Sequence, residues 1–323
     1  MSGHSVPEEI ADGTFLIVDG AVWQDGTTCV YLVLGARGAI VETGPAKCVD
    51  ALMDGLRAAD VVPERIAYIV PTHIHIDHGG GAGLLAQRLP GAKVAVCRQG
   101  ARHIVDPGRL IAGTKAYFGE DYADRFGPIL PVDPDRLLAV CEGDTLDLGA
   151  GHSLRIMHTP GHAPHHHSLY DPATGVLFPG EAAGIHLADP GVTVPCTGGG
   201  SYDHAATVAD LARFTALGIR AVAYSHWGVG HDGERSLLEA ARRTVAWGEA
   251  LLDTLRSGDG SNGSADRQLA LGTQLFLDLA LAAIAERGAA PDLVARLLPG
   301  LEMVIPDLAL RGYLDHFRQQ GLL

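Results

Sequence analysis

The chain has 323 residues, of which 47% are hydrophobic and 19% charged, with a formal net charge of −14. This composition is that of an ordinary globular protein with one main core and an appendage. The acidic balance without basic blocks disfavours a nucleic-acid partner, because phosphate neutralisation supplies most of that affinity. No apolar run reaches the ~18 residues of a membrane helix, and residues 1–12 lack a signal-peptide pattern, so we expect a cytoplasmic protein without membrane contact.

Strands and helices alternate over the first hundred residues. The strands are predicted from runs of β-branched and other apolar residues, and the helices from apolar residues at helical spacing. The expected strands are Thr14–Val18, Cys29–Leu34, Ala39–Glu42, Ile66–Val70 and Lys93–Cys97, and the expected helices are Cys48–Ala59 and Gly81–Arg88. This alternation is typical of layered α/β architecture.

A segment rich in glycine and proline follows over residues 106–134, and it carries Tyr117, Phe118, Tyr122 and Phe126. We predict an irregular flap with one or two short helices. Long irregular segments are often functional lids, but aromatic residues also anchor surface loops on a core, so both interpretations stay open.

Strands return after the flap, and helices dominate the C-terminal part. We expect strands at Leu137–Cys141, Thr145–Leu148, Ser153–His158, His166–Tyr170, Val176–Phe178 and Arg220–Tyr224, and a helix at His204–Leu217. Helical spacing recurs over residues 233–257, 266–287, 290–298 and 307–319, with a flexible connector at Gly258–Ser264. These patterns predict a main domain over residues 1–232 and a C-terminal helical subdomain over residues 233–323. The apolar faces of its helices either cover the mouth of a site or form a homodimer contact.

The densest polar motif is the run THIHIDHGGG over residues 72–81, directly after an expected strand. Side chains two apart in an extended segment point the same way, so His73 and His75 can bind one metal ion together. Asp77 and His78 suit a second ion nearby. The three glycines let the backbone turn close to the site before a helix begins.

Three later segments place metal-binding residue types after apolar strands. His162 lies in the turn Thr-Pro-Gly-His, Glu181 follows Gly180, and His226 follows Ser225 at a strand end. Any one of these pieces is explained by chance. All of them in this order indicate a metal centre rather than a histidine-rich surface loop.

The His-x-His-x-Asp-His motif with these later segments resembles the metallo-β-lactamase superfamily of hydrolases. The resemblance implies an α/β fold of the αββα sandwich type, with two mixed β-sheets flanked by helices, over about the first 230 residues. It implies a first metal site of His73, His75 and His162 and a second of Asp77, His78, Glu181 and His226. Relatives usually have an aspartate that bridges both metals at the place of Glu181. The glutamate either bridges as well or binds one metal only.

The implied cofactor is a pair of divalent metal ions, with zinc as the default and iron or manganese suited to the same ligands. A hydroxide that bridges the two metals would attack the substrate, while Asp77 orients it and passes a proton to the leaving group. Within the superfamily the chain is similar to the group of glyoxalase II and acyl-homoserine lactonases. We therefore expect hydrolysis of an ester, thioester or lactone bond in a small-molecule acyl substrate.

Three alternatives remain. A phosphodiesterase of the same fold would use arginines such as Arg98, Arg102 and Arg109 near the mouth of the site. A metal-containing protein that binds a ligand or regulates without hydrolytic turnover is kept open by Glu181. An oxygen-using iron enzyme is less favoured, because the ligand set suits two metals.

The remaining histidines and cysteines receive weaker predictions. His166 matches the place of an outer histidine in many relatives, but we expect it to be structural, like His158, His165 and His167. No motif supports His186, His204 or His231 as ligands, and Asp189 and Asp203 are poorer substitutes for Glu181. The five scattered cysteines share no metal-type spacing, and Cys196 alone is a candidate pocket residue.

Overall fold

The computed structural model describes residues 7–19, 28–198, 200–257 and 264–323. The chain divides into two compact units. The sheet unit comprises residues 1–158, 165–180 and 219–231, and the helix unit comprises residues 159–164, 181–218 and 232–323. The helix unit is thus assembled from three separate stretches of chain. The predicted domain division after residue 232 stays a prediction.

Seven strands form the first sheet of the sheet unit, in the order β1-β2-β3-β4-β5-β6-β7. Neighbours are antiparallel from β1 to β4 and parallel from β4 to β7. The strands are β1 (Glu8–Ala11), β2 (Thr14–Asp19), β3 (Cys29–Leu34), β4 (Gly38–Val41), β5 (Ile66–Val70), β6 (Lys93–Cys97) and β7 (Leu137–Val140). β1 is not predicted from the sequence, because its four residues are too few and too polar to show a strand pattern.

Six strands form the second sheet, in the order β15-β14-β11-β10-β9-β8. All neighbours are antiparallel except β11 and β14, which are parallel. The strands are β8 (Thr145–Gly149), β9 (His152–His158), β10 (His167–Asp171), β11 (Val176–Phe178), β14 (Ala221–Ala223) and β15 (Val229–Gly230). Only β15 is not predicted, because a two-residue strand leaves no pattern.

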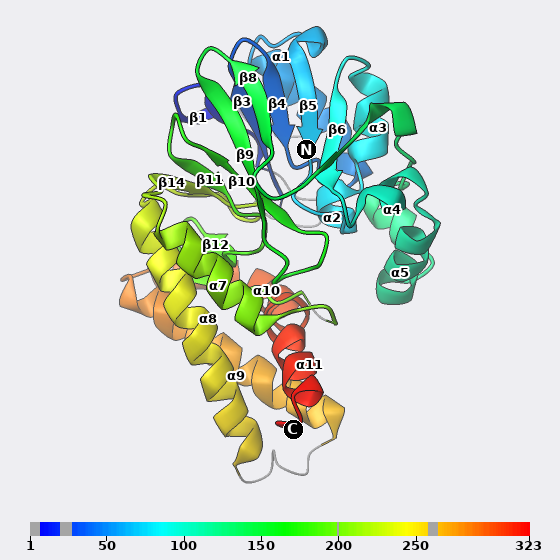
Figure 1. The fold of residues 1–323 in the computed structure, drawn as a ribbon. Helices are drawn as coiled ribbons and strands as arrows, with labels where there is room; N and C mark the ends of the chain where they lie inside the picture. Colours follow the sequence, from blue (N-terminus) through cyan, green and yellow to red (C-terminus); the bar gives the residue numbers. More distant parts are fainter. Residues whose placement is uncertain (1–6, 20–27, 199, 258–263) are drawn as a thin grey trace. The chain divides into compact units, whose positions relative to one another are not determined.

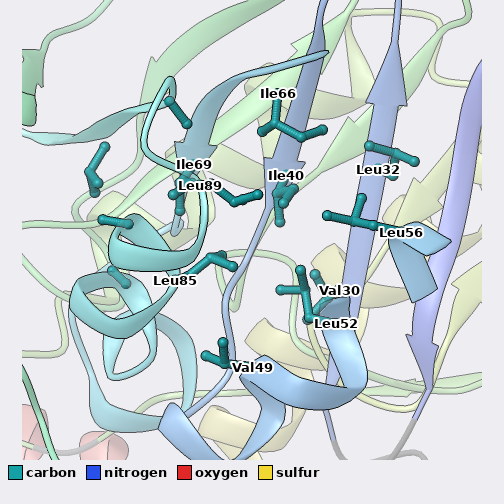
Figure 2. Close-up of a cluster of buried hydrophobic side chains, with 14 of the residues drawn as sticks. Val30, Leu32, Ile40, Val49, Leu52, Leu56, Ile66, Ile69, Leu85 and Leu89 are labelled. Carbon is teal, nitrogen blue, oxygen red and sulfur yellow. The ribbon is translucent and has the colours of Figure 1, made fainter. Parts of the chain in front are cut away.

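Two apolar layers hold the sheet unit together. One lies between the first sheet and the helices α1 (Val49–Ala58) and α3 (Ala82–Arg88), where Leu52 and Leu85 pack against strand residues such as Ile40 (Figure 2). The other joins the inner faces of the two sheets, with Val41 and Phe178 among its residues. Figure 1 shows the two sheets as layers of this unit, with α1 and α3 beside the first. The predicted α/β class, with two mixed sheets flanked by helices, is confirmed.

The segment after β6 contains more helix than the sequence indicates. It forms α4 (Ala101–Val105), α5 (Gly108–Phe118) and α6 (Tyr122–Phe126), and α5 alone spans eleven residues. Tyr122 and Phe126 are buried with Ile129 against Ile76, which lies inside the histidine motif. This packing supports the anchor interpretation for these two aromatic side chains. Tyr117, by contrast, is 52% exposed.

In the residues that the structure describes, the helix unit has five α-helices and a short hairpin. The helices are α7 (His204–Thr215), α8 (Gly233–Arg256), α9 (Ala265–Glu286), α10 (Pro291–Val304) and α11 (Arg311–Gln319), with a π-helical stretch at Ile305–Leu310 before α11. The hairpin pairs β12 (Ile185–Leu187) with β13 (Val192–Val194), in a stretch where we expect neither strand nor helix from the sequence. The predicted C-terminal helices are confirmed, and the connector at Gly258–Ser264 lies, except for Ser264, outside the described residues.

The sheet unit also contains short helices. They are the 3-10 helices at Ala46–Cys48, Pro63–Arg65 and Pro134–Arg136 and the short α2 at Ile76–Gly79.

Helix α9 stands out by its hydropathy. Among the described helices it alone is long and apolar enough to cross a membrane, and 28% of its most apolar 18-residue window is buried. One such helix is weak evidence, since core helices of proteins that never meet a membrane pass the same test. The expectations of a cytoplasmic location and no membrane contact stay predictions.

Candidate metal centre

The seven predicted ligands are divided between the two units. The sheet unit carries His73, His75, Asp77, His78 and His226, and the helix unit carries the other two, His162 and Glu181. The ligand assignment as one complete set stays a prediction.

The histidine motif turns sharply after β5 and then enters α2. His73 and His75 lie side by side, with Nε2 of His73 at 2.9 Å from Nδ1 of His75. The backbone is so close-packed that a Cβ on Gly79 would lie 3.0 Å from the carbonyl oxygen of His73. This crowding explains why glycine follows the ligand residues.

Asp77 and His78 lie on the single turn of α2, not on an extended strand. Oδ2 of Asp77 is 3.6 Å from Nε2 of His78 and 3.8 Å from Nε2 of His226. The ligand atoms of Asp77, His78 and His226 all lie within 4.8 Å of one another. Two imidazole nitrogens and a carboxylate oxygen at this spacing fit a divalent ion. The sheet unit therefore contains a His/Asp cluster able to hold a metal ion, although the geometry does not identify the metal.

The turn between β14 and β15 presents His226. The backbone there is held by a hydrogen bond from the Tyr224 amide to the Gly228 carbonyl, and the Tyr31 hydroxyl donates to the carbonyl of Tyr224 at 2.5 Å. Trp227, the residue after the ligand, has a positive φ of 58°. A bulky residue with positive φ is unusual, so the backbone bends sharply directly after the candidate ligand His226.

Glu42 is a buried residue beside the candidate ligands that no sequence motif indicates. Its carboxylate is 2% exposed and accepts hydrogen bonds from Nδ1 of His78 at 3.1 Å, from the Thr72 hydroxyl at 2.6 Å and from the Ser225 hydroxyl at 2.6 Å. The Thr72 amide adds a fourth at 3.1 Å. Thr72 precedes His73 and Ser225 precedes His226, so one carboxylate ties together two ligand-bearing loops. The only sequence signal is an acidic residue directly after an apolar strand.

Charge and hydrogen bonding favour the ionised form of Glu42. Burial alone would raise the pKa of its carboxyl group, but the charge of His78 and the hydrogen bonds from His78, Ser225 and Thr72 lower that pKa overall. A carboxylate on Nδ1 fixes the tautomer and ring orientation of His78, so that Nε2 faces Asp77 and His226. Glu42 thus orients the candidate ligand His78 and is not itself among the candidate ligands.

In the helix unit, His162 and Glu181 form a buried pair. Nε2 of His162 is 2.9 Å from Oε2 of Glu181, and the two side chains are 1% and 2% exposed. A backbone hydrogen bond stabilises the Thr-Pro-Gly-His turn, because the Asp203 amide donates to the Gly161 carbonyl at 2.7 Å. Asp203 itself is the N-cap of α7, bonded to the Ala206 amide, which removes it as a substitute for Glu181.

The other histidines occupy varied places in their units. His186 bonds to the Thr193 hydroxyl across the β12–β13 hairpin, His204 contacts the rings of Tyr202 and Tyr313, and His231 is exposed. His167 is fully buried on β10, and burial lowers the pKa of its imidazole to about 4. In the described part of the chain, neither ring nitrogen of His167 has a hydrogen-bond partner. His167 therefore behaves as a neutral core residue, in line with the structural role that the sequence predicts.

Comparison with known proteins identifies the family. The family model of the metallo-beta-lactamase superfamily matches residues 22–226. The metallo-beta-lactamase fold-containing protein ST1585 of Sulfurisphaera tokodaii is 31% identical over 222 residues, which cover 67% of this chain and 79% of that protein. The crystal structure of the metallo-beta-lactamase family protein TTHA1429 from Thermus thermophilus covers 97% of this chain and 95% of its own, with a TM-score of 0.66 at 23% identity. At that identity the likeness shows the fold alone.

Other relatives carry functional names over shorter spans. The acyl-coenzyme A thioesterase MBLAC2 of Gallus gallus is 29% identical over 53% of this chain and 63% of its own length. The N-acyl homoserine lactonase AttM of Rhizobium radiobacter is 30% identical over 36% of this chain and 40% of its own. Diflavin flavoprotein A 1 of Synechocystis is 29% identical over 52% of this chain, but the match spans only 26% of that flavoprotein.

Proposed function

Because the chain belongs to the metallo-β-lactamase superfamily, we propose that it is a metal-dependent hydrolase that cleaves an ester, thioester or lactone bond in a small acyl substrate. The observation that carries the proposal is the convergence of Asp77, His78 and His226 on one point of the sheet unit. The names of the thioesterase and lactonase relatives support the choice of acyl bonds.

The proposed centre holds two divalent ions, zinc by default. Its ligands are the residues predicted from the sequence: for the first ion His73, His75 and His162, for the second Asp77, His78 and His226, and Glu181 as a shared carboxylate. Imidazole and carboxylate donors suit zinc, and they suit iron and manganese as well. The joint action of ligands from both units is part of the proposal.

The chemistry requires a proton carrier beside the reacting bond. When bound, divalent ions lower the pKa of a coordinated water and polarise a substrate carbonyl. Asp77 is the one member of its cluster with appreciable exposure, 16% for its side chain against 1% for His78 and 5% for His226. Its carboxylate is therefore placed to accept a proton from the attacking water and to deliver it to the leaving group. The two buried imidazoles stay fixed, and Glu42 holds the orientation of His78.

A phosphodiesterase is the second candidate function. Arg98, Arg102 and Arg109 are exposed, and none of them forms an ion pair with a carboxylate among the described residues. Arg102 also donates to Nε2 of the neighbouring His103 at 3.1 Å. Arginines without acidic partners are suited to phosphate oxygens, which favours a phosphorylated substrate or leaving group.

The proposal extends to partners and location. We propose a cytoplasmic enzyme without nucleic-acid or membrane partners that forms a homodimer through its C-terminal helices. Support for the dimer comes from α9, where Leu269, Leu275 and Leu279 are only half-buried although the helix is strongly apolar.

The function is tested by elemental analysis of the purified protein together with a panel of thioester, lactone and phosphodiester substrates. We expect about two equivalents of metal and turnover of a thioester or lactone. His226→Ala should lower the metal content and reduce turnover by several orders of magnitude, while the exposed His231→Ala serves as control. A protein that holds two metals and hydrolyses nothing in the panel would instead be a ligand-binding or regulatory protein. Turnover of the phosphodiester alone would select the second candidate.

A further inference from the structure

Three consecutive residues of the helix unit, Cys196, Thr197 and Gly198, each contact a different neighbour. The Cys196 thiol donates a hydrogen bond to Oε1 of Glu181, with Sγ and Oε1 at 3.0 Å. The Thr197 hydroxyl accepts a hydrogen bond at 3.0 Å from the backbone amide of Gly312, which is the second residue of α11. We call these three residues the 196–198 segment. Its first two side chains are 4% and 0% exposed, so solvent does not compete for these bonds.

The two oxygens of the Glu181 carboxylate face different neighbours. Oε1 accepts from the Cys196 thiol, while Oε2 lies 2.9 Å from Nε2 of His162. A glutamate has one more rotatable bond than an aspartate, so its carboxylate needs an additional contact to keep one orientation. The thiol supplies a contact of this kind on the side away from His162.

Gly198 fixes the other member of the pair. It has a positive φ of 63°, and a Cβ at this position would lie 2.3 Å from the His162 ring. The segment therefore presses its backbone against the imidazole at one end while its thiol binds the carboxylate at the other. Both candidate ligands of the helix unit are held by the same three residues.

We propose that Cys196 is a positioning residue that holds Glu181 so that Oε2, beside His162, is the oxygen offered to a divalent ion. The inference rests on the proposed metal centre. It assigns Cys196 a role that does not require the thiol to touch metal or substrate.

The C-terminal helix α11 supports the same segment. A Cβ on Gly312 would lie 2.5 Å from Cβ of Thr197, so the backbone of α11 packs directly on the segment. The next residue, Tyr313, is fully buried and donates its hydroxyl hydrogen to the carbonyl of Thr244 in α8. The C-terminal helices thus brace the segment that positions Glu181.

The test compares metal affinity in four purified variants, with zinc titrated against a chelating dye. Cys196→Ala should weaken zinc binding by about 10- to 100-fold, the usual effect of losing a group that orients a ligand. Cys196→Ser keeps a donor and should stay within about threefold of the parent protein. The matched control is Cys97→Ala, which removes a buried thiol that donates to the Gln99 side chain at 2.9 Å in the sheet unit. Glu181→Gln gives the effect of impairing the ligand itself.

A double variant separates positioning from simple packing. If Cys196 acts through Glu181, adding Cys196→Ala to Glu181→Gln should cause no further loss of zinc affinity, whereas a packing defect would add its own loss. Urea unfolding of the metal-free proteins shows whether each variant folds. The inference is overturned if Cys196→Ala binds zinc like the parent, if the serine variant is as weak as the alanine variant, or if the double variant loses affinity additively. Normal zinc binding by Glu181→Gln would instead refute the proposed ligand role of Glu181.

Discussion

Oε1 of Glu42 lies 3.1 Å from Nδ1 of His78, and both side chains are almost fully buried. The pair sets which ring nitrogen of His78 faces Asp77 and His226. The same carboxylate also accepts hydrogen bonds from the hydroxyls of Thr72 and Ser225. The loop that carries His73 and the loop that carries His226 therefore share one acceptor. The geometry of the metal cluster therefore depends on a residue outside it.

Replacing Glu42 by glutamine should weaken the metal cluster without unfolding the protein. The amide keeps the size of the side chain but loses the charge and one acceptor, so the His78 ring becomes free to reorient. We expect a loss of about 10- to 100-fold in affinity for one of the metal equivalents, measured by zinc titration with elemental analysis. The exposed Glu64→Gln is the control, and unchanged affinity in Glu42→Gln would refute the orienting role.

Gly180→Ala should disturb the hydrogen bonds around Glu42 by a steric clash. Gly180 has a φ of +59°, and a Cβ there would lie 2.3 Å from Nε2 of His166 and 2.8 Å from the Thr72 hydroxyl. We expect a lower free energy of unfolding and weaker metal binding, because Thr72 must move away from Glu42. Gly143→Ala is the matched control, since Gly143 also has a positive φ of 85° but open space around it, and its cost should be only about 1 kcal/mol. Equal costs for the two variants, from urea unfolding, would show that the contacts with His166 and Thr72 are unimportant.

Phe126→Ala tests whether the segment after β6 anchors the histidine motif. Phe126 is fully buried in the cluster with Ile76, so its truncation should lower the free energy of unfolding by about 3–5 kcal/mol and loosen α2. Hydrogen exchange of the amides of residues 76–79 should quicken. Tyr117→Ala, at a side chain that is 52% exposed, should change stability by less than about 0.5 kcal/mol. Protection of α2 that survives the loss of Phe126 would favour a detachable lid.

The buried imidazole of His167 predicts a loss of stability in mild acid. Burial holds the pKa of its imidazole at about 4 in the folded protein, whereas the ordinary histidine pKa of about 6.5 applies in the unfolded chain. Below about pH 6.5 the imidazole of His167 binds a proton in the unfolded chain but stays neutral in the folded chain. The free energy of unfolding therefore falls as the pH drops from about 6.5 to 4, and the full contribution of His167 to stability is present above that range. The difference corresponds to roughly 3 kcal/mol.

His167→Leu isolates this contribution. The variant should be at least as stable as the parent at pH 5 and should show a flatter dependence of unfolding free energy on pH. Both proteins are measured free of metal by urea unfolding, because metal release also depends on pH. His231→Leu, at an exposed site, should follow the parent curve. A steep acid loss that persists in His167→Leu would assign it to other groups.

Much of the fold follows from pattern alone, because strands β3, β5 and β6 contain short apolar runs bounded by polar, glycine or proline residues. The strand β1 and the hairpin β12–β13 do not, since β1 is mostly polar and each hairpin strand has only three residues, too few to show a pattern. The length of α5 is also hidden, because its glycines suggest breaks while tertiary packing keeps the helix intact.

The candidate site divides in the same way. The ligands are visible because histidine and acidic residues cluster at strand ends, where packing does not call for them. Glu42 is not indicated by any motif, and Cys196 is indicated only as a candidate pocket residue and not as a partner of Glu181. Each forms a hydrogen bond to a residue far away in sequence, 36 positions for Glu42 and 15 for Cys196. No local pattern encodes a bond of that range.

The assembly of the helix unit from three stretches limits how the protein can be shortened. A protease that cuts after residue 231 would remove α8 to α11 yet leave every candidate ligand on the remaining fragment. That fragment would lose Arg243, whose guanidinium donates a hydrogen bond to the Thr193 carbonyl. The apolar side chains of the β12–β13 hairpin, which are buried in the whole chain, would become exposed to solvent. A truncated homologue with an intact ligand list should therefore be insoluble, so counting ligands is a poor guide to whether a shortened gene still encodes a working protein.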